Sequence, residues 1–104
     1  KAKIFAKIAA KKGMGKKMVE VLNSENGLPA TRAYEGCNYV QMVYNEESNS
    51  VWITSEWETN EQYMRYRDWR FNEDDFLSKN LLPLMLGGEK GLTIAHTNSN
   101  YSAY

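Results

Sequence analysis

The order in which two hydrophobic periodicities follow each other most restricts the fold of this sequence. In residues 3–10 (KIFAKIAA) apolar side chains occupy every second position on one side, which is typical of a half-buried β-strand. In residues 15–24 apolar side chains recur at helical spacing, and the segment NSENGLP then supplies the Asn, Gly and Pro that end a helix. A strand followed directly by an amphipathic helix indicates a chain that folds back onto a sheet.

The rest of the chain contains a hairpin and then a second helical region before a final strand. Residues 38–46 and 51–57 are rich in β-branched and aromatic residues and flank a polar turn of hairpin length. A capped helix over 60–70, a short helix over 73–85 and a strand over 90–97 follow. The order strand–helix–strand–strand–helix–strand predicts an α+β, ferredoxin-like fold, in which a four-stranded antiparallel sheet carries helices on one face.

Composition excludes only the extreme classes of protein. The chain has 104 residues, 42% hydrophobic and 25% charged, and we expect one domain over 1–97 followed by a polar tail at 98–104. Its formal net charge of +0 gives no overall attraction to nucleic acid or to an anionic membrane. The longest apolar run, LLPLMLGG, is too short to cross a bilayer. A single cysteine, Cys37, and the lack of a secretory signal at the start predict a cytoplasmic protein.

The basic residues are unevenly distributed. Seven of the 13 basic residues lie within the first 17 positions, which hold no acidic residue. One interpretation is a solvated face on the first strand and helix. The other is a basic patch that binds an anionic ligand or an acidic partner.

The two faces of the predicted sheet differ in character. The helix-facing set comprises Ile4, Ala6, Ile8, Val51, Ile53, Trp57, Leu92 and Ile94. The opposite set comprises Phe5, Lys7, Trp52, Thr54, Glu56, Thr93 and Ala95. The second set is too aromatic for a face in plain solvent and too polar for a dry core, so we predict a homodimer through this face. Because the first and third strands are neighbours in this topology, Lys7 and Glu56 are expected to pair there.

Two segments resemble a known family. The spacing Arg-x-x-x-Gly-Cys in TRAYEGC (31–37) and the segment SEWETNEQYMRYRDWR (55–70) are similar to the antibiotic-biosynthesis-monooxygenase (ABM) family of dimeric α/β-barrel proteins. The resemblance extends over roughly 3–96. It implies the ferredoxin-like fold and a dimer, and its cofactor-free oxygenase members imply an enzyme without cofactor or metal. The family also includes heme degraders and many members without an assigned activity.

Some of the family's site residues have counterparts in this sequence, and others are replaced. Trp57 corresponds to a tryptophan that lines a pocket between the sheet and the helices, and Tyr63 to an aromatic residue facing the same pocket. Members that oxidise polycyclic phenols carry an asparagine at the position of Ile53. Many members carry a histidine at the position of Tyr66. The asparagine amide is therefore absent at position 53 and the helix histidine is absent at position 66.

The remaining candidates follow from chemistry. Cofactor-free oxygenation of a phenol needs a dry cavity, a deprotonated substrate and donors for the developing anion. Tyr63, Tyr66 or an arginine could bind a phenolate, and His96 could take its proton near neutral pH. The arginines available to bind substrate are Arg32, Arg67 and Arg70. Each candidate also has a structural interpretation, because aromatic residues fill cores and a lone histidine is often a satisfied core residue.

The alternatives for the arginines and the glycine are structural. Arg67 and Arg70 could pair in solvent with Asp68, Glu73 or Asp74, where such pairs contribute on the order of 0–1 kcal/mol. Arg32 could close the pocket rim or pair across a dimer. Gly36 is expected to adopt a conformation that other residues resist. Cys37 is then a small, partly buried residue rather than a nucleophile.

Two functions remain open after these steps. The first is a cofactor-independent monooxygenase that acts on a small aromatic or quinol substrate, with Tyr63, Tyr66 and His96 as catalytic residues. The second is a non-catalytic dimer that binds a small apolar or amphipathic ligand, such as an apolar acid. The sequence contains no P-loop, dinucleotide fingerprint or zinc-ligand spacing, and the segment VWITSEW lacks the basic-aromatic motif of RNA-recognition domains.

Overall fold

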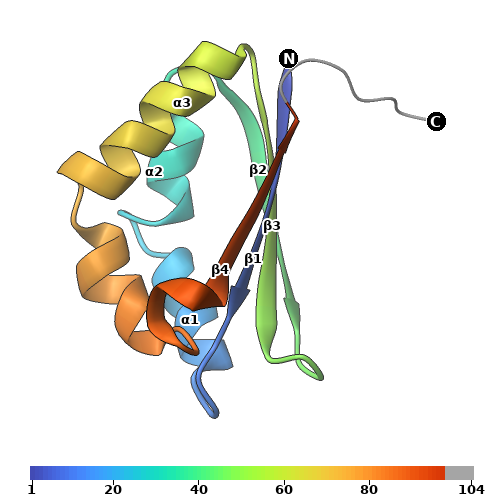
Figure 1. Ribbon diagram of the computed structural model, residues 1–104, viewed down its shortest axis with the longest axis vertical. Coiled ribbons are helices and arrows are strands. Elements are labelled where there is room, and N and C mark those ends of the chain that lie inside the picture. Colours follow the sequence, from blue (N-terminus) through green and yellow to red (C-terminus); the bar gives the residue numbers. More distant parts are fainter. Residues whose placement is uncertain (98–104) are drawn as a thin grey trace.

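A computed structural model describes residues 1–97, and the predicted tail, 98–104, lies outside the described residues. Four antiparallel strands form one sheet in the order β2-β3-β1-β4 (Figure 1). The strands are β1 (Ala2–Ala9), β2 (Cys37–Asn45), β3 (Ser50–Trp57) and β4 (Leu92–Thr97). The sheet confirms the ferredoxin-like fold that the periodicities predict.

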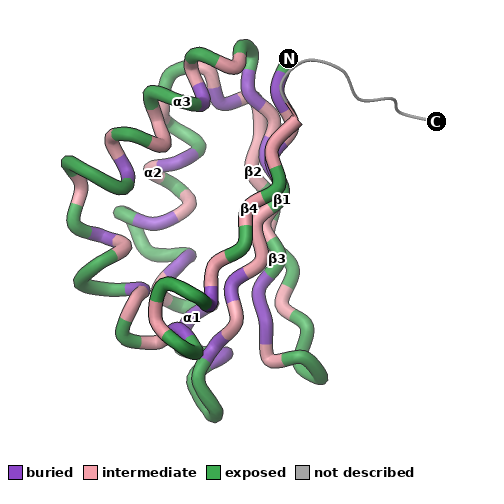
Figure 2. The backbone as a smooth tube through the Cα atoms, in the orientation of Figure 1, coloured by how far each residue is buried: buried purple, intermediate pink, exposed green. Residues whose placement is uncertain are grey.

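All helices lie on one side of the sheet (Figure 1). The α-helices are α1 (Gly15–Leu22), α2 (Leu28–Ala33) and α3 (Asn60–Asp68). Four shorter turns connect α3 to β4: the π-helical turns η1 (Trp69–Glu73) and η2 (Leu77–Leu81), and the 3-10 turns η3 (Leu82–Leu84) and η4 (Gly88–Gly91). Figure 2 shows that buried positions line the inner sides of these helices and recur along the strands.

The helical layer differs from the prediction in two places. The helix α2 was not predicted, because its six residues are too few to show a helical period; Pro29 in its first turn is the one local signal. The helix predicted over 73–85 is divided between η2 and η3. Pro83 has no N–H to donate to the preceding turn, and the chain forms a short 3-10 turn there instead.

The strand register confirms the assignment of the two faces and corrects one pair. In the β1–β3 ladder Lys7 lies opposite Trp52, whereas Glu56 lies opposite Lys3. The expected Lys7–Glu56 pair is therefore wrong, because the two residues are four positions apart along the ladder. Instead, the Lys7 ammonium lies 5.1 Å from the ring centroid of Trp52, a cation–π contact.

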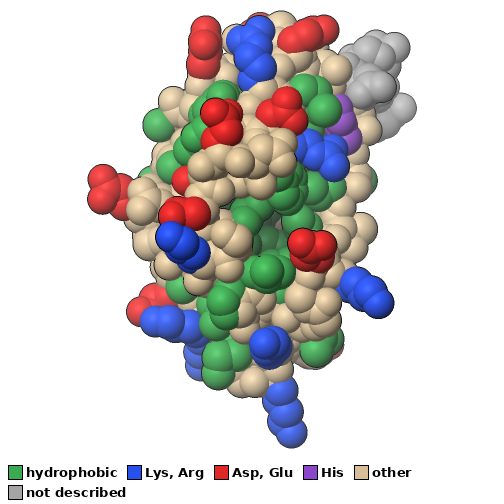
Figure 3. Space-filling view, turned by 60° about the vertical axis from the view of Figure 1, so that its left-hand side comes forward, with side chains coloured by type: hydrophobic (Ala, Val, Ile, Leu, Met, Phe, Trp, Pro, Cys, Tyr) green, Lys and Arg blue, Asp and Glu red, His purple; other side chains and the backbone are tan. Residues whose placement is uncertain are grey.

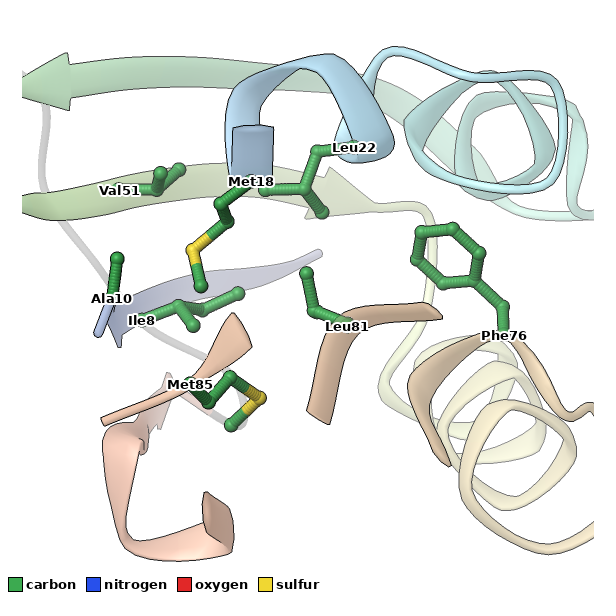
Figure 4. Close-up of a cluster of buried hydrophobic side chains, with 8 residues drawn as sticks. All are labelled: Ile8, Ala10, Met18, Leu22, Val51, Phe76, Leu81 and Met85. Atoms are coloured by element: carbon green, nitrogen blue, oxygen red, sulfur yellow. The ribbon is translucent and has the colours of Figure 1, made fainter. Parts of the chain in front are cut away.

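Two apolar clusters fill the space between the sheet and the helices. The larger one joins β1 and β3 to α1 and to the segment from Phe76 to Met85 (Figure 4). Its buried members are Ile8, Ala10, Met18, Leu22, Val51, Phe76, Leu81 and Met85. The smaller cluster lies around Trp57 and comprises Ala2, Ile4, Cys37, Trp57 and Tyr63. Burial in these clusters is the main apolar stabilisation of the fold.

The start of β2 and the start of α3 are packed against each other. The Thr59 hydroxyl accepts a hydrogen bond from the Gln62 backbone N–H at 3.1 Å, which confirms the predicted cap. Gly36 has a φ of +96°, and a Cβ atom there would lie 2.6 Å from Cβ of Gln62. Glycine is therefore required at this position both by backbone conformation and by space.

Candidate functional site

A cavity lies between the helix-facing side of the sheet and the helical layer. Its volume is about 100 Å³. Figure 3 shows a hollow floored by hydrophobic side chains on the face formed by the helical layer. Aliphatic side chains of β1, β3 and β4 form the sheet side, and Ile53 is among them. The polar and aromatic lining residues are Thr31, Ser55, Tyr63, Tyr66, Arg67, Arg70, Phe71 and Phe76.

Trp57 supports the wall of the cavity from behind. Its side chain is fully buried and does not line the cavity. Its ring centroid lies 4.8 Å from that of Tyr66 and 5.7 Å from that of Tyr63, and its indole N–H donates to the Ser55 hydroxyl at 3.0 Å. Trp57 therefore fixes the positions of the two tyrosines that the cavity does contact.

The Arg70 guanidinium is buried and fully hydrogen-bonded. Its Nη1 donates to the Asn26 carbonyl at 2.9 Å and to Asp74 Oδ2 at 2.8 Å. Its Nη2 donates to the Gly27 carbonyl and to Thr31 Oγ1, both at 2.9 Å. With Nε also engaged, every N–H of the guanidinium has an acceptor.

Sequence reasoning identified Asp74 as a partner of Arg70 but placed the pair in solvent, which is wrong. Arg70 is 4% exposed. A buried arginine requires acceptors on all sides, and here most of them come from the loop before α2 and from α2 itself. Those acceptors lie about 40 positions earlier in the chain and give no signal in the local sequence.

Tyr66 belongs to the same network. Its hydroxyl accepts the Arg70 Nε–H at 3.0 Å and lies 2.7 Å from Thr31 Oγ1. The hydroxyl is therefore held in place by two protein groups, and its ring, rather than its oxygen, is the part available to a ligand.

Tyr63 and Arg67, one turn apart on α3, form a second group with His96. The rings of Tyr63 and His96 meet edge to face with centroids 4.8 Å apart. Burial raises the pKa of the Tyr63 phenol above its ordinary value of 10, and the charge and hydrogen bonding of Arg67 oppose this rise. Tyr63 therefore remains a protonated donor near neutral pH.

His96 lies at the edge of this group. Burial, and then the positive charge of Arg67, lower the pKa of His96 below its ordinary value of 6.5. Its Nε2 is buried without a hydrogen-bond partner among the described residues. The ring does not line the cavity, but it contacts Tyr63, which does.

Arg67 is the lining cation that is open to a ligand. It is partly exposed, and its guanidinium carbon lies 5.8 Å from the ring centroid of Phe71. Within residues 1–97 no carboxylate lies within ion-pair distance of it. Arg70, the other lining cation, has no free N–H left.

Arg32 lies outside the cavity. Its exposed side chain donates from Nη1 to the Cys37 carbonyl at 2.8 Å, at the start of β2. Cys37 is buried, and burial raises the pKa of its thiol, while the charge of Arg32 opposes the rise. The thiol is protonated at neutral pH, in agreement with its interpretation as a small core residue.

Sequence reasoning missed Thr31, Phe71 and Leu77 as members of the site. Thr31 lies on the unpredicted helix α2. Phe71 and Leu77 follow α3 through two π-helical turns, which shift the phase of the helical pattern, so their shared orientation is hidden from a 3.6-residue period.

Among residues 1–97 no group of three or more His, Cys, Asp or Glu side chains could hold a metal ion. No helix in that part of the chain is long and apolar enough to cross a bilayer.

The architecture defines a ferredoxin-like α+β protein with a cavity between its sheet and its helices. Within that class, the chain shares its fold with proteins named for antibiotic biosynthesis monooxygenases. No family profile matches the sequence, and none of the curated proteins is significantly similar to it.

Solved structures match the whole chain. A provisionally named antibiotic biosynthesis monooxygenase from Deinococcus radiodurans has a TM-score of 0.76 and 13% sequence identity, with 100% of this chain and 97% of that chain covered. PA3566 from Pseudomonas aeruginosa has a TM-score of 0.70 and 17% identity, with 96% and 94% covered. NE2512 from Nitrosomonas europaea, a protein of unknown function, has a TM-score of 0.71 and 16% identity, with 99% and 92% covered. At this sequence identity the structural similarity confirms the fold that the family resemblance implies. It does not assign an activity to this chain.

We predict that replacing Arg70 with Met lowers the free energy of unfolding by about 3–5 kcal/mol, because the Asp74 carboxylate and four further acceptors would lose their buried donor. Chemical denaturation would measure the change. Arg65→Met, an exposed arginine on α3, is the control and should change stability by less than about 0.5 kcal/mol. A loss for Arg70→Met no larger than that of the control would contradict the role of the network.

We predict that His96 contributes to the pH dependence of stability. The folded state disfavours the protonated ring, so the unfolded chain takes up a proton more readily, and stability present above about pH 6.5 is lost as the pH falls below it. His96→Gln should flatten the dependence of unfolding free energy on pH between about 5 and 7. Equal slopes for the two proteins would show that His96 titrates normally in the folded state.

Proposed function

We propose that the protein binds a small, mainly apolar molecule that carries one anionic oxygen, with the oxygen at Arg67. The observation that supports this proposal is a cation on the wall of an apolar cavity without an acidic partner in the described chain. Apolar walls favour an apolar ligand body, and a guanidinium beside them favours a carboxylate or phenolate through charge-assisted hydrogen bonds.

The neighbouring groups support binding of an anion. The Tyr63 phenol remains protonated and lies beside Arg67, so it can donate a second hydrogen bond to the same oxygen. The Tyr66 ring and the aliphatic side chains of the sheet contact the apolar part of the ligand.

Binding without chemistry is favoured by two features of the cavity. Ile53 stands where phenol-oxidising members of the ABM family carry an asparagine, so the cavity has no amide at that point. The Tyr66 hydroxyl is held by Arg70 and Thr31 and is not free for acid–base work.

We predict that Arg67→Met weakens the binding of hexanoate and benzoate by about 10- to 100-fold, because a charge-assisted hydrogen bond in a partly buried site is lost. The uncharged analogues hexanol and benzyl alcohol should bind the variant and the original protein equally. Isothermal titration calorimetry measures both, with Arg65→Met as the control. Unchanged affinity of Arg67→Met for the acids would exclude Arg67 as the anion site.

The second candidate is cofactor-independent monooxygenation of a small aromatic or quinol substrate. Structural neighbours named as antibiotic biosynthesis monooxygenases favour it, as does the edge-to-face contact of Tyr63 with a largely unprotonated His96. In such a reaction a ring C–H position of the substrate is oxygenated and the phenol ring becomes a quinone. One atom of O₂ enters the product and the other leaves as water, with all four electrons supplied by the substrate.

We predict for this candidate that oxygen uptake with a panel of naphthols and hydroquinones exceeds autoxidation and falls in both His96→Gln and Tyr63→Phe. An oxygen electrode measures the rate, and heat-denatured protein provides the baseline. Uptake no faster than the baseline for every compound would remove the oxygenase and leave the binding function in place.

We also propose that two copies pair through the outer face of the sheet. Phe5, Val43 and Trp52 are 44%, 63% and 46% exposed there, an unusual concentration of apolar side chains on one face.

Trp52→Glu should shift the protein from dimer to monomer in sedimentation at micromolar concentration. Leu86→Glu, at an exposed apolar side chain outside the sheet, is the control and should leave the dimer intact. A wild-type protein that sediments only as a monomer would refute the pairing.

A further inference from the structure

We propose that the ligand is an elongated aliphatic carboxylic acid whose head binds at Arg67 and whose tail leaves the cavity along a second groove. This inference rests on the proposed binding function and narrows it from any small apolar anion to an unbranched chain. It follows from the size of the cavity, from the groove that adjoins it, and from the positions of the charges.

The cavity alone is too small for a bulky ligand. Its volume is about 100 Å³. For comparison, an apolar cavity of about 150 Å³ binds a single benzene molecule, and typical ligand sites enclose about 300–1,000 Å³. A polycyclic ring system therefore does not fit inside the cavity, which counts against naphthols as substrates of the oxygenase candidate. A ligand with substantial apolar area must extend out of the cavity.

A groove of about 330 Å³ adjoins the cavity at the η turns. The two share Arg70, Phe71, Leu77 and Leu92 as lining residues, so they lie next to each other along these four side chains. Beyond this shared wall the groove adds the apolar side chains of Leu82 and Met85. A flexible alkyl chain can follow such a path and bury its methylene groups on the way.

The charged lining residues indicate in which direction the bound fatty acid lies. Arg67 lines the cavity and not the groove, whereas Asp74 and Glu89 line the groove and not the cavity. Asp74 is neutralised by its ion pair with Arg70 at 2.8 Å, but Glu89 is exposed and has no ion pair within residues 1–97. A carboxylate is attracted to the cavity end and repelled from the groove end, so the alkyl tail occupies the groove.

The first test is a chain-length series from butanoate to dodecanoate, measured by isothermal titration calorimetry. Each added methylene should increase affinity by about fourfold until the tail passes the end of the groove, after which the increase stops. The matching n-alcohols should bind the wild-type protein more weakly than the acids and should bind Arg67→Met with unchanged affinity.

The second test blocks the groove without touching the cavity. Ser78 is exposed and lines only the groove, so Ser78→Trp should fill it. This variant should lose the added affinity for decanoate and keep the wild-type affinity for butanoate. Asn80→Trp, an exposed position on the same turn that lines neither space, is the matched control. Leu82→Gln, a milder change in the groove wall, should weaken decanoate in the same direction.

The outcomes separate this inference from the function on which it rests. If butanoate and benzoate bind through Arg67 but affinity does not rise with chain length, the elongated ligand is excluded and the anion-binding cavity remains. If decanoate binds to both Ser78→Trp and Arg67→Met as tightly as to the wild-type protein, it binds elsewhere and the inference is overturned. If no carboxylate of any length binds, the proposed binding function fails as well.

Discussion

The buried guanidinium of Arg70 is the interaction on which the helical layer depends. It reaches from η1 to the carbonyls of Asn26 and Gly27 and to the Thr31 hydroxyl, so it joins the segment after α3 to α2 and to the loop before it. Burying a positive charge is costly, and the cost is offset only because every N–H has an acceptor. The helices on both sides of the cavity are thus tied together by polar contacts around its rim. They do not need to collapse onto the sheet to be held in place.

Strand positions were readily predicted from sequence because a half-buried strand repeats every two residues, and residues 3–10, 51–57 and 90–97 follow that period closely. The helical layer was predicted less well. The six residues of α2 complete fewer than two turns, and the π-helical turns after α3 change the period within one continuous segment. Local periodicity identifies an element only where the element is long and regular.

The site residues were likewise predicted only in part. Tyr63 was identified through the family resemblance and Arg67 as one of the arginines available to bind an anion, and the two lie one turn apart on α3. Arg70 lies only three positions after Arg67, yet it is buried and its bonding capacity is full, while Arg67 remains without an acidic partner in the described chain. What distinguishes them is the path of a loop far away in sequence, which supplies carbonyls to one and not to the other. No local pattern contains that information.

The central position of β1 in the sheet has a consequence for how the molecule is made. Its two hydrogen-bonding edges are filled by β3 and by β4, and the second contact joins Lys3 to Thr97, 94 positions later. During translation the edge of β1 that pairs with β4 therefore stays unpaired until almost all of the described chain has left the ribosome. The native topology combines late closure with high contact order, which predicts slow folding and a nascent chain that needs protection from edge-to-edge association.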